Sequence, residues 1–231
     1  MPAIFLIEPL PGSHMYILAM SLFLSAIIAR VWLTYLKWID VFEPERNIYL
    51  AITFIMSCAT LLLVFPITDM IQSFGFTING NPLNDFLYST ITIGSVEEVA
   101  KLIPLLIMLV ASKQLNEPID YIVYASVSAL GFAFIENILY IEKTGLSALS
   151  ARLLYSSVAH MFFSSIIGYT LAINVIKKLR RFFLHLCIGL VLASLAHGFY
   201  DFWLINKEFY LPIVTTIFYV GSLNVVVTFY I

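Results

Sequence analysis

Glu97, Glu98 and Lys101 are charged residues within a stretch, 84–112, that is otherwise almost entirely apolar. An ionised side chain near a bilayer centre costs about 2.5 to 3.5 kcal/mol on insertion scales, so such residues have a specific role. On a helix, the lysine follows both glutamates by about one turn, which places all three on one face. Lys101 can keep one carboxylate ionised, while burial and repulsion favour the neutral form of the other. Such a pair is suited to general acid–base catalysis.

Three further polar clusters interrupt later apolar runs. They are Glu136 with Asn137, His160 with Ser164, and His197 with Asp201. Each has an ordinary structural explanation on its own, such as an interhelical hydrogen bond from His160 or an interfacial position for Asp201. Together with the glutamate pair, they favour one functional site over four separate coincidences.

The composition is typical of an integral membrane protein. Hydrophobic residues make up 61% of the 231 residues, charged residues 11%, and the mean hydropathy is +0.96. A soluble protein has about a quarter of its residues charged. Apolar runs fill residues 1–231, which predicts a single transmembrane domain. No basic patch suggests nucleic acid, and the isolated Cys58 and Cys187 favour packing roles over a metal site or disulfide.

Runs of about 20 apolar residues, the length that crosses a bilayer, predict an all-α bundle of seven transmembrane helices. The predicted helices cover 14–37, 48–71, 84–112, 118–142, 147–177, 180–205 and 209–231. Lysine and arginine are concentrated in the first, third and fifth connections. The amino terminus is therefore predicted outside and the carboxyl terminus inside.

The four polar clusters fall in one layer of this predicted bundle. At about 1.5 Å per residue, they lie about 9 to 20 Å from the outer ends of their helices. Helices from the region 84–205 can therefore bring them to a single pocket that opens to the outside.

The ordered motifs resemble those of the PrsW family of intramembrane proteases. They read Glu97-Glu98-x-x-Lys101, Phe132-x-x-x-Glu136-Asn137, His160-x-x-x-Ser164 and His197-x-x-x-Asp201. The set is also similar to the CAAX-prenyl protease and bacteriocin-processing superfamily. That pattern has an arginine one residue beyond Lys101, a histidine in place of Glu136 and an asparagine in place of Asp201, so the departures favour PrsW.

The resemblance implies a peptidase in a prokaryotic cell membrane, with its catalytic core at about 84–205 and its active site on the extracytoplasmic side. The expected reaction is hydrolysis of a peptide bond in a single-pass membrane protein, such as an anti-sigma factor. The expected surroundings are the lipid bilayer and the membrane-anchored substrate.

Two mechanisms suit these residues. In the favoured one, which needs no metal, Glu97 or Glu98 takes a proton from water, and His160 or His197, the latter oriented by Asp201, stabilises the oxyanion. Glu136 and Asn137 then position water or backbone, with Lys101 and Ser164 in support. In the alternative, Glu136, His160 and His197 hold Zn²⁺ and Glu97 or Glu98 is the base.

Two readings from other classes remain open. A proton- or cation-coupled transporter also places acids and histidines near the membrane midplane. The small size and the absence of an inverted repeat in the sequence weigh against it. A non-catalytic membrane scaffold of the same fold is the other alternative.

Overall fold

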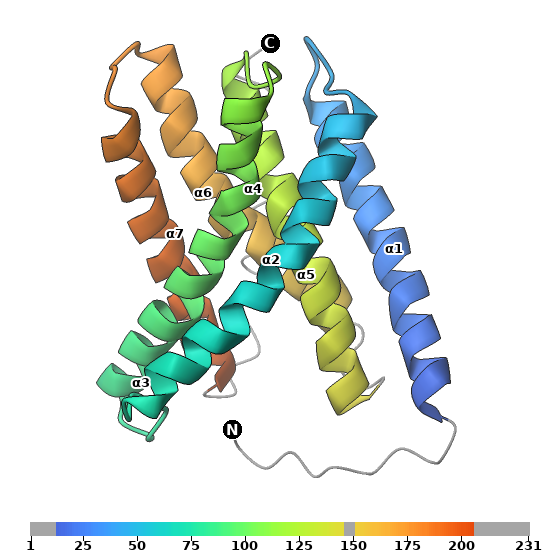
Figure 1. Ribbon diagram of the computed structural model, residues 1–231, viewed down its shortest axis with the longest axis vertical. Coiled ribbons are helices and arrows are strands. Elements are labelled where there is room, and N and C mark those ends of the chain that lie inside the picture. The colour runs from blue at the N-terminus through green and yellow to red at the C-terminus, as the bar shows by residue number, and fades with distance from the viewer. Residues whose placement is uncertain (1–12, 146–150, 206–231) are drawn as a thin grey trace.

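The computed structural model describes residues 13–145 and 151–205, and the regular elements in these two ranges are all helical (Figure 1). Two of the elements, named η, are π-helical. In chain order the elements are α1 (Ser13–Ile39), α2 (Asn47–Ser73), α3 (Pro82–Tyr88), η1 (Ser89–Ser95), α4 (Val96–Ala111), α5 (Pro118–Thr144), η3 (Ala151–Ser156), α6 (Ser157–Ile176) and α7 (Phe182–Ile205).

Five of these helices are long and apolar enough to cross a membrane, which confirms the predicted all-helical membrane protein. The candidate spans are Met15–Ile39, Asn47–Ser73, Pro118–Thr144, Leu153–Ile176 and Phe182–Ile205. The predicted helix 84–112 consists of α3, η1 and α4 in succession, and the predicted helix 209–231 lies outside the described residues.

Helix α5 is at the centre of the bundle, between α1 and α6 in Figure 1. It contacts α1, α2, α4 and α6. In the 18-residue apolar stretch of α5, 78% of the residues are buried, whereas in that of α1 only 22% are buried. Small residues allow this close packing. A Cβ atom on Gly131 would overlap the backbone of Phe54 in α2, so only glycine permits the two helices to approach at this point.

Local sequence signals set the starts of α3 and α5. The side chain of Asn81 accepts hydrogen bonds from the backbone N–H groups of Leu83 and Asn84, and Pro82 occupies the first turn of α3. Glu117 and Asp120 form a capping box around Pro118 at the start of α5. Both arrangements satisfy helix N–H groups that have no partner within the helix.

The π-helical segment η1 joins α3 to α4 without a turn and packs along α7. A Cβ on Gly198 of α7 would overlap the backbone of Thr90 in η1, so the two segments are in backbone contact. This contact brings α7 against the start of α4, where Glu97 and Glu98 lie.

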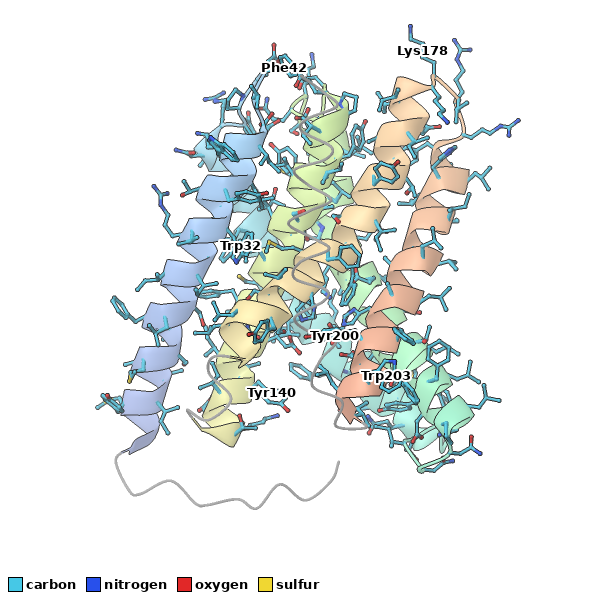
Figure 2. The ribbon with its side chains drawn as sticks, turned by 180° about the vertical axis from the view of Figure 1, so that it is seen from behind. Trp32, Phe42, Tyr140, Lys178, Tyr200 and Trp203 are labelled. Atoms are coloured by element: carbon cyan, nitrogen blue, oxygen red, sulfur yellow. The ribbon has the colours of Figure 1, made fainter. Side chains whose placement is uncertain are left out.

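The connections 40–46, 112–117 and 177–181 lie at one end of the bundle. Figure 2 shows Phe42 and Lys178 at this end and Tyr140 and Trp203 toward the other. By lysine and arginine bias, the first end is the predicted inner one. The orientation of the chain in the membrane stays a prediction.

Candidate active site

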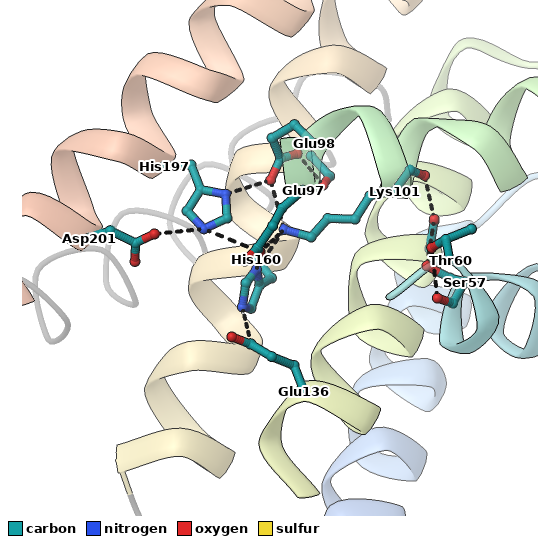
Figure 3. A network of polar contacts seen from close by, with 11 residues as sticks. Ser57, Thr60, Glu97, Glu98, Lys101, Glu136, His160, His197 and Asp201 are labelled. Carbon is teal, nitrogen blue, oxygen red and sulfur yellow. Dashed lines mark hydrogen bonds and ion pairs between the residues drawn. The ribbon is translucent and has the colours of Figure 1, made fainter. Parts of the chain in front are cut away.

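Lys101 is at the centre of a polar network inside the bundle (Figure 3). Its side chain is only 1% exposed, and Nζ lies 3.2 Å from Oε2 of Glu97, 2.9 Å from Oε1 of Glu98 and 2.7 Å from Nδ1 of His160. An ammonium group has three N–H donors, so these three acceptors use all of them. Nζ also lies 4.5 Å from the centre of the Phe132 ring, a cation–π distance.

Glu98 is fully buried and its carboxylate is engaged on both oxygens. Oε1 accepts from Lys101 and lies 3.0 Å from Nδ1 of His197, while Oε2 accepts from Ser164 Oγ at 2.6 Å. Three helices, α4, α6 and α7, therefore meet at this one side chain. Such a set of contacts makes Glu98 an anchor for the groups around it.

Glu97 has looser contacts than its neighbour. Beyond its contact with Lys101, Oε2 lies 3.8 Å from Nδ1 of His160 and 3.7 Å from Nε2 of His197, both longer than a hydrogen bond. The residue is 7% exposed, against 0% for Glu98. Of the two glutamates, Glu97 therefore has the oxygen lone pairs that are more available to a reacting molecule.

His160 is held between Lys101 and Glu136. Because an ammonium group only donates, Nδ1 accepts from Lys101 and the ring proton is on Nε2, which lies 2.9 Å from Oε2 of Glu136. The side chain of Glu136 is 24% exposed, so it lies at the more open side of the network.

His197 is oriented by Glu98 at one nitrogen and lies near two carboxylates at the other. Nδ1 is 3.0 Å from Glu98, while Nε2 is 3.4 Å from Oδ2 of Asp201 and 3.7 Å from Glu97. The ring stacks on Phe163 with centroids 4.8 Å apart, which fixes its plane. Glu98 thus contacts one ring nitrogen, and Asp201, which the sequence predicted to orient this ring, lies near the other.

The remaining predicted residues lie at the edge of the network. Asn137 is buried one residue after Glu136, where Nδ2 donates to Ser157 Oγ at 3.0 Å and Oδ1 has no protein partner. Sequence reasoning missed Ser128, whose hydroxyl donates to the Lys101 carbonyl at 2.5 Å. A serine one helix away carries no sequence signal for this contact.

The network contains a set of atoms that could hold a metal. Glu97, His160 and His197 each offer a ligand atom, and the three atoms lie within 4.8 Å of one another. Two histidines and a glutamate form a donor set that zinc uses in metalloproteases. The structure thus groups Glu97 with the two histidines, whereas the sequence predicted Glu136 as the third ligand. Lys101 already donates to His160 Nδ1, so a metal at that nitrogen would displace the ammonium.

The family model described as "PrsW family intramembrane metalloprotease" matches residues 43–231. The chain belongs to the PrsW family. It is 32% identical to a protein named Protease PrsW from Geobacillus kaustophilus over 75% of this chain and 74% of the relative. PrsW proteases of Shouchella clausii and Clostridioides difficile are 30% and 28% identical, over 79% and 87% of this chain and 82% and 86% of the relatives.

No solved structure matches this PrsW chain. Membership of the PrsW family identifies the chain as an intramembrane protease and an integral membrane protein. Each of the four polar clusters singled out in the sequence contributes at least one residue to the network that Figure 3 shows, from α4, α5, α6 and α7.

Proposed function

We propose that this chain hydrolyses a peptide bond of a membrane-anchored protein, with a water molecule activated by Glu97. The observation that supports this proposal best is the convergence of two buried carboxylates and the His160 imidazole on Lys101, with the His197 imidazole held by one of these carboxylates, that of Glu98. Four helices contribute to this network, and burying its charges is costly. A purely structural role does not require two adjacent acids, one with three hydrogen-bond partners and the other with looser contacts.

Glu97 is the general base in this proposal because Glu98 is already engaged by three donors. Water gives a proton to Glu97 and its oxygen attacks the carbonyl carbon. The oxyanion accepts a hydrogen bond from Nε2–H of His160, in place of Glu136. The proton on Glu97 then passes to the leaving nitrogen as the C–N bond breaks, which leaves a carboxylic acid and an amine.

The proposed substrate is a single-pass membrane protein, such as an anti-sigma factor. The network lies in the half of the bundle away from the connections 40–46 and 112–117. His160 is near the start of α6 and His197 near the end of α7, and both are therefore far from the connection 177–181 at that end. With the predicted orientation, this half faces the extracytoplasmic side of the membrane, and the more exposed Glu136 and Asp201 mark where a substrate would approach.

The test is cleavage of a single-pass substrate in proteoliposomes by the purified Glu97→Gln variant. We expect activity to fall about 10²- to 10⁴-fold, the usual contribution of a general base. Glu142→Gln is the matched control, because Glu142 is an exposed glutamate at the end of α5. Wild-type activity in Glu97→Gln would overturn the proposal. Ion flux without proteolysis would favour a transporter.

A zinc-dependent version is the second candidate, supported by the Glu97, His160 and His197 grouping and by the description of the family as metalloproteases. These three residues would hold the metal, and Glu136, whose carboxylate lies 2.9 Å from His160 Nε2, would act as the base. Zinc in such a site supplies Lewis acidity and a water that ionises near neutral pH.

Metal content distinguishes the two versions. If the zinc version holds, the purified active protein contains one zinc per chain, chelation removes zinc and activity together, and His197→Ala lowers the zinc content. If the metal-free version holds, activity persists after exhaustive chelation at unchanged rate. Either result excludes the other version while leaving peptide hydrolysis itself in place.

A further inference from the structure

A second cluster of acids lies at the opposite end of the bundle from the candidate active site. Asp40 follows the end of α1, and Glu117 and Asp120 begin α5. Each offers a carboxylate oxygen, and the three oxygens lie within 4.8 Å of one another. The cluster joins α1 to α5, two helices that are in contact along the bundle.

Asp40 is the residue that distinguishes this cluster from an ordinary helix cap. It is 1% exposed, and Oδ2 accepts from the backbone N–H of Glu45 at 2.8 Å, but Oδ1 is buried and has no hydrogen-bond partner. A buried polar atom without a partner is costly, and a buried charge more so. Asp40 Oδ1 therefore requires a binding partner that lies within the cluster.

The two acids of α5 each have one side committed to the helix start. Asp120 Oδ2 accepts from the backbone N–H groups of Asn116 at 2.9 Å and Glu117 at 2.6 Å, and the side chain of Glu117 accepts from the backbone of Asp120. Oε2 of Glu117 is buried and has no partner. Asp40, just after α1, and Glu117, just before α5, thus each have one unpartnered carboxylate oxygen, and both residues belong to the cluster.

Nearby basic side chains make other contacts. Lys37 Nζ donates to Asn47 Oδ1 at 2.8 Å, and the Arg46 guanidinium lies 5.5 Å from the centre of the Tyr49 ring. Among the residues that the structure describes, neither lysine nor arginine forms an ion pair with any of the three carboxylates. In the described ranges, the cluster therefore has no direct lysine or arginine partner.

A pocket lies next to the cluster, between the connections 40–46 and 112–117. Glu45 and Asn116 are among the residues that line it, and their backbone N–H groups bind Asp40 and Asp120 respectively. Glu43 also lines the pocket, together with the basic residues Arg46 and Lys113.

We propose that Asp40, Glu117 and Asp120 form a binding site for a hard divalent cation, Mg²⁺ or Ca²⁺, that links the end of α1 to the start of α5. Carboxylate oxygens are the ligands that these two ions prefer, and water completes their coordination. The site is structural, because it lies at the end of the bundle away from the network around Lys101.

The test measures thermal unfolding of the full chain in detergent, in EDTA and then with Mg²⁺ or Ca²⁺ added. A ligand that binds only the folded protein raises Tm. We expect one of the two ions to raise Tm of the wild type by several degrees, and equilibrium dialysis to show which ion binds. Asp40→Asn keeps an acceptor for the Glu45 N–H but removes a charge. We therefore expect this variant to match or exceed the wild-type Tm in EDTA and to lose the cation response.

Glu142→Gln is the matched control, because Glu142 is an exposed acid at the opposite end of α5, and it should respond to the cation as the wild type does. Two results would overturn the proposal: a wild-type Tm unchanged by both ions, or an equal cation response in Asp40→Asn. The first would indicate that a proton or water satisfies Asp40 Oδ1. Zinc content and proteolysis are separate measurements, so this outcome does not depend on the active-site mechanism.

Discussion

Nδ1 of His197 in α7 lies 3.0 Å from Oε1 of Glu98 in α4, although 99 positions separate the two residues in the chain. This contact sets which nitrogen of His197 faces Glu97 and Asp201. A carboxylate that holds one imidazole nitrogen in this way fixes the orientation and tautomer of the ring. In the proposed mechanism, Glu98 therefore orients His197, while Glu97 acts on water.

The first prediction separates the two glutamates. Glu98→Gln removes the charge behind three hydrogen bonds, so we expect it to lower the free energy of unfolding by about 1.5 to 3 kcal/mol and also to lower the cleavage rate. Glu97→Gln should lower the cleavage rate with little change in stability, because its contacts are looser. Thermal unfolding and substrate cleavage, measured on both variants, check this division. A stable but inactive Glu98→Gln beside an active Glu97→Gln would reverse the two roles.

The second prediction concerns Lys101. Lys101→Met keeps an unbranched side chain, one atom shorter, but leaves two buried carboxylates without their cation, which should cost about 3 to 5 kcal/mol of stability. The double variant Lys101→Met/Glu98→Gln removes one of the unpaired charges and should recover part of this loss while remaining inactive. Lys113→Met is the control, because that lysine is exposed. Equal stability of Lys101→Met and wild type would show that the ion pairs contribute little.

The third prediction tests the contact between η1 and α7. Gly198→Ala would place a methyl group in the backbone of Thr90 and push α7 away from η1. A displacement of about 1 Å can reduce a reaction rate about 100-fold, so we expect a large loss of activity as His197 moves from Glu98. Overpacking should also cost about 1 to 3 kcal/mol. Leu195→Ala, on an exposed part of the same helix, should retain activity. Normal cleavage by Gly198→Ala would mean that this contact does not position His197.

The sequence predicted the helical membrane class because hydropathy reports directly on burial in lipid. The boundaries of α2, observed at Asn47–Ser73 against a predicted 48–71, show how well apolar runs mark helix ends. Helical spacing also predicted that Lys101 faces Glu97 and Glu98, since contacts three and four residues apart are local. These features depend only on residues close together in the chain.

Contacts between helices could not be predicted in the same way. Nothing in the spacing of His197 and Asp201 indicates that Glu98 takes the ring nitrogen, or that Glu97 joins the two histidines. The π-helical hydrogen bonding of η1 has no hydropathy signal either. The sequence carries no signal that Asp40 and Glu117 lie close together, because their proximity depends on how α1 packs on α5.

The π-helical turn between α3 and α4 has a consequence for insertions and deletions in this part of the chain. A π-bulge accommodates one residue more than a regular α-helix would hold over the same turns. Removing one residue from Ser89–Ser95 would therefore convert the bulge to regular α-helical turns and change which residues of η1, such as Thr90, pack against Gly198 of α7. Chain length in this short segment is thus as tightly constrained as the identity of the charged residues that follow it.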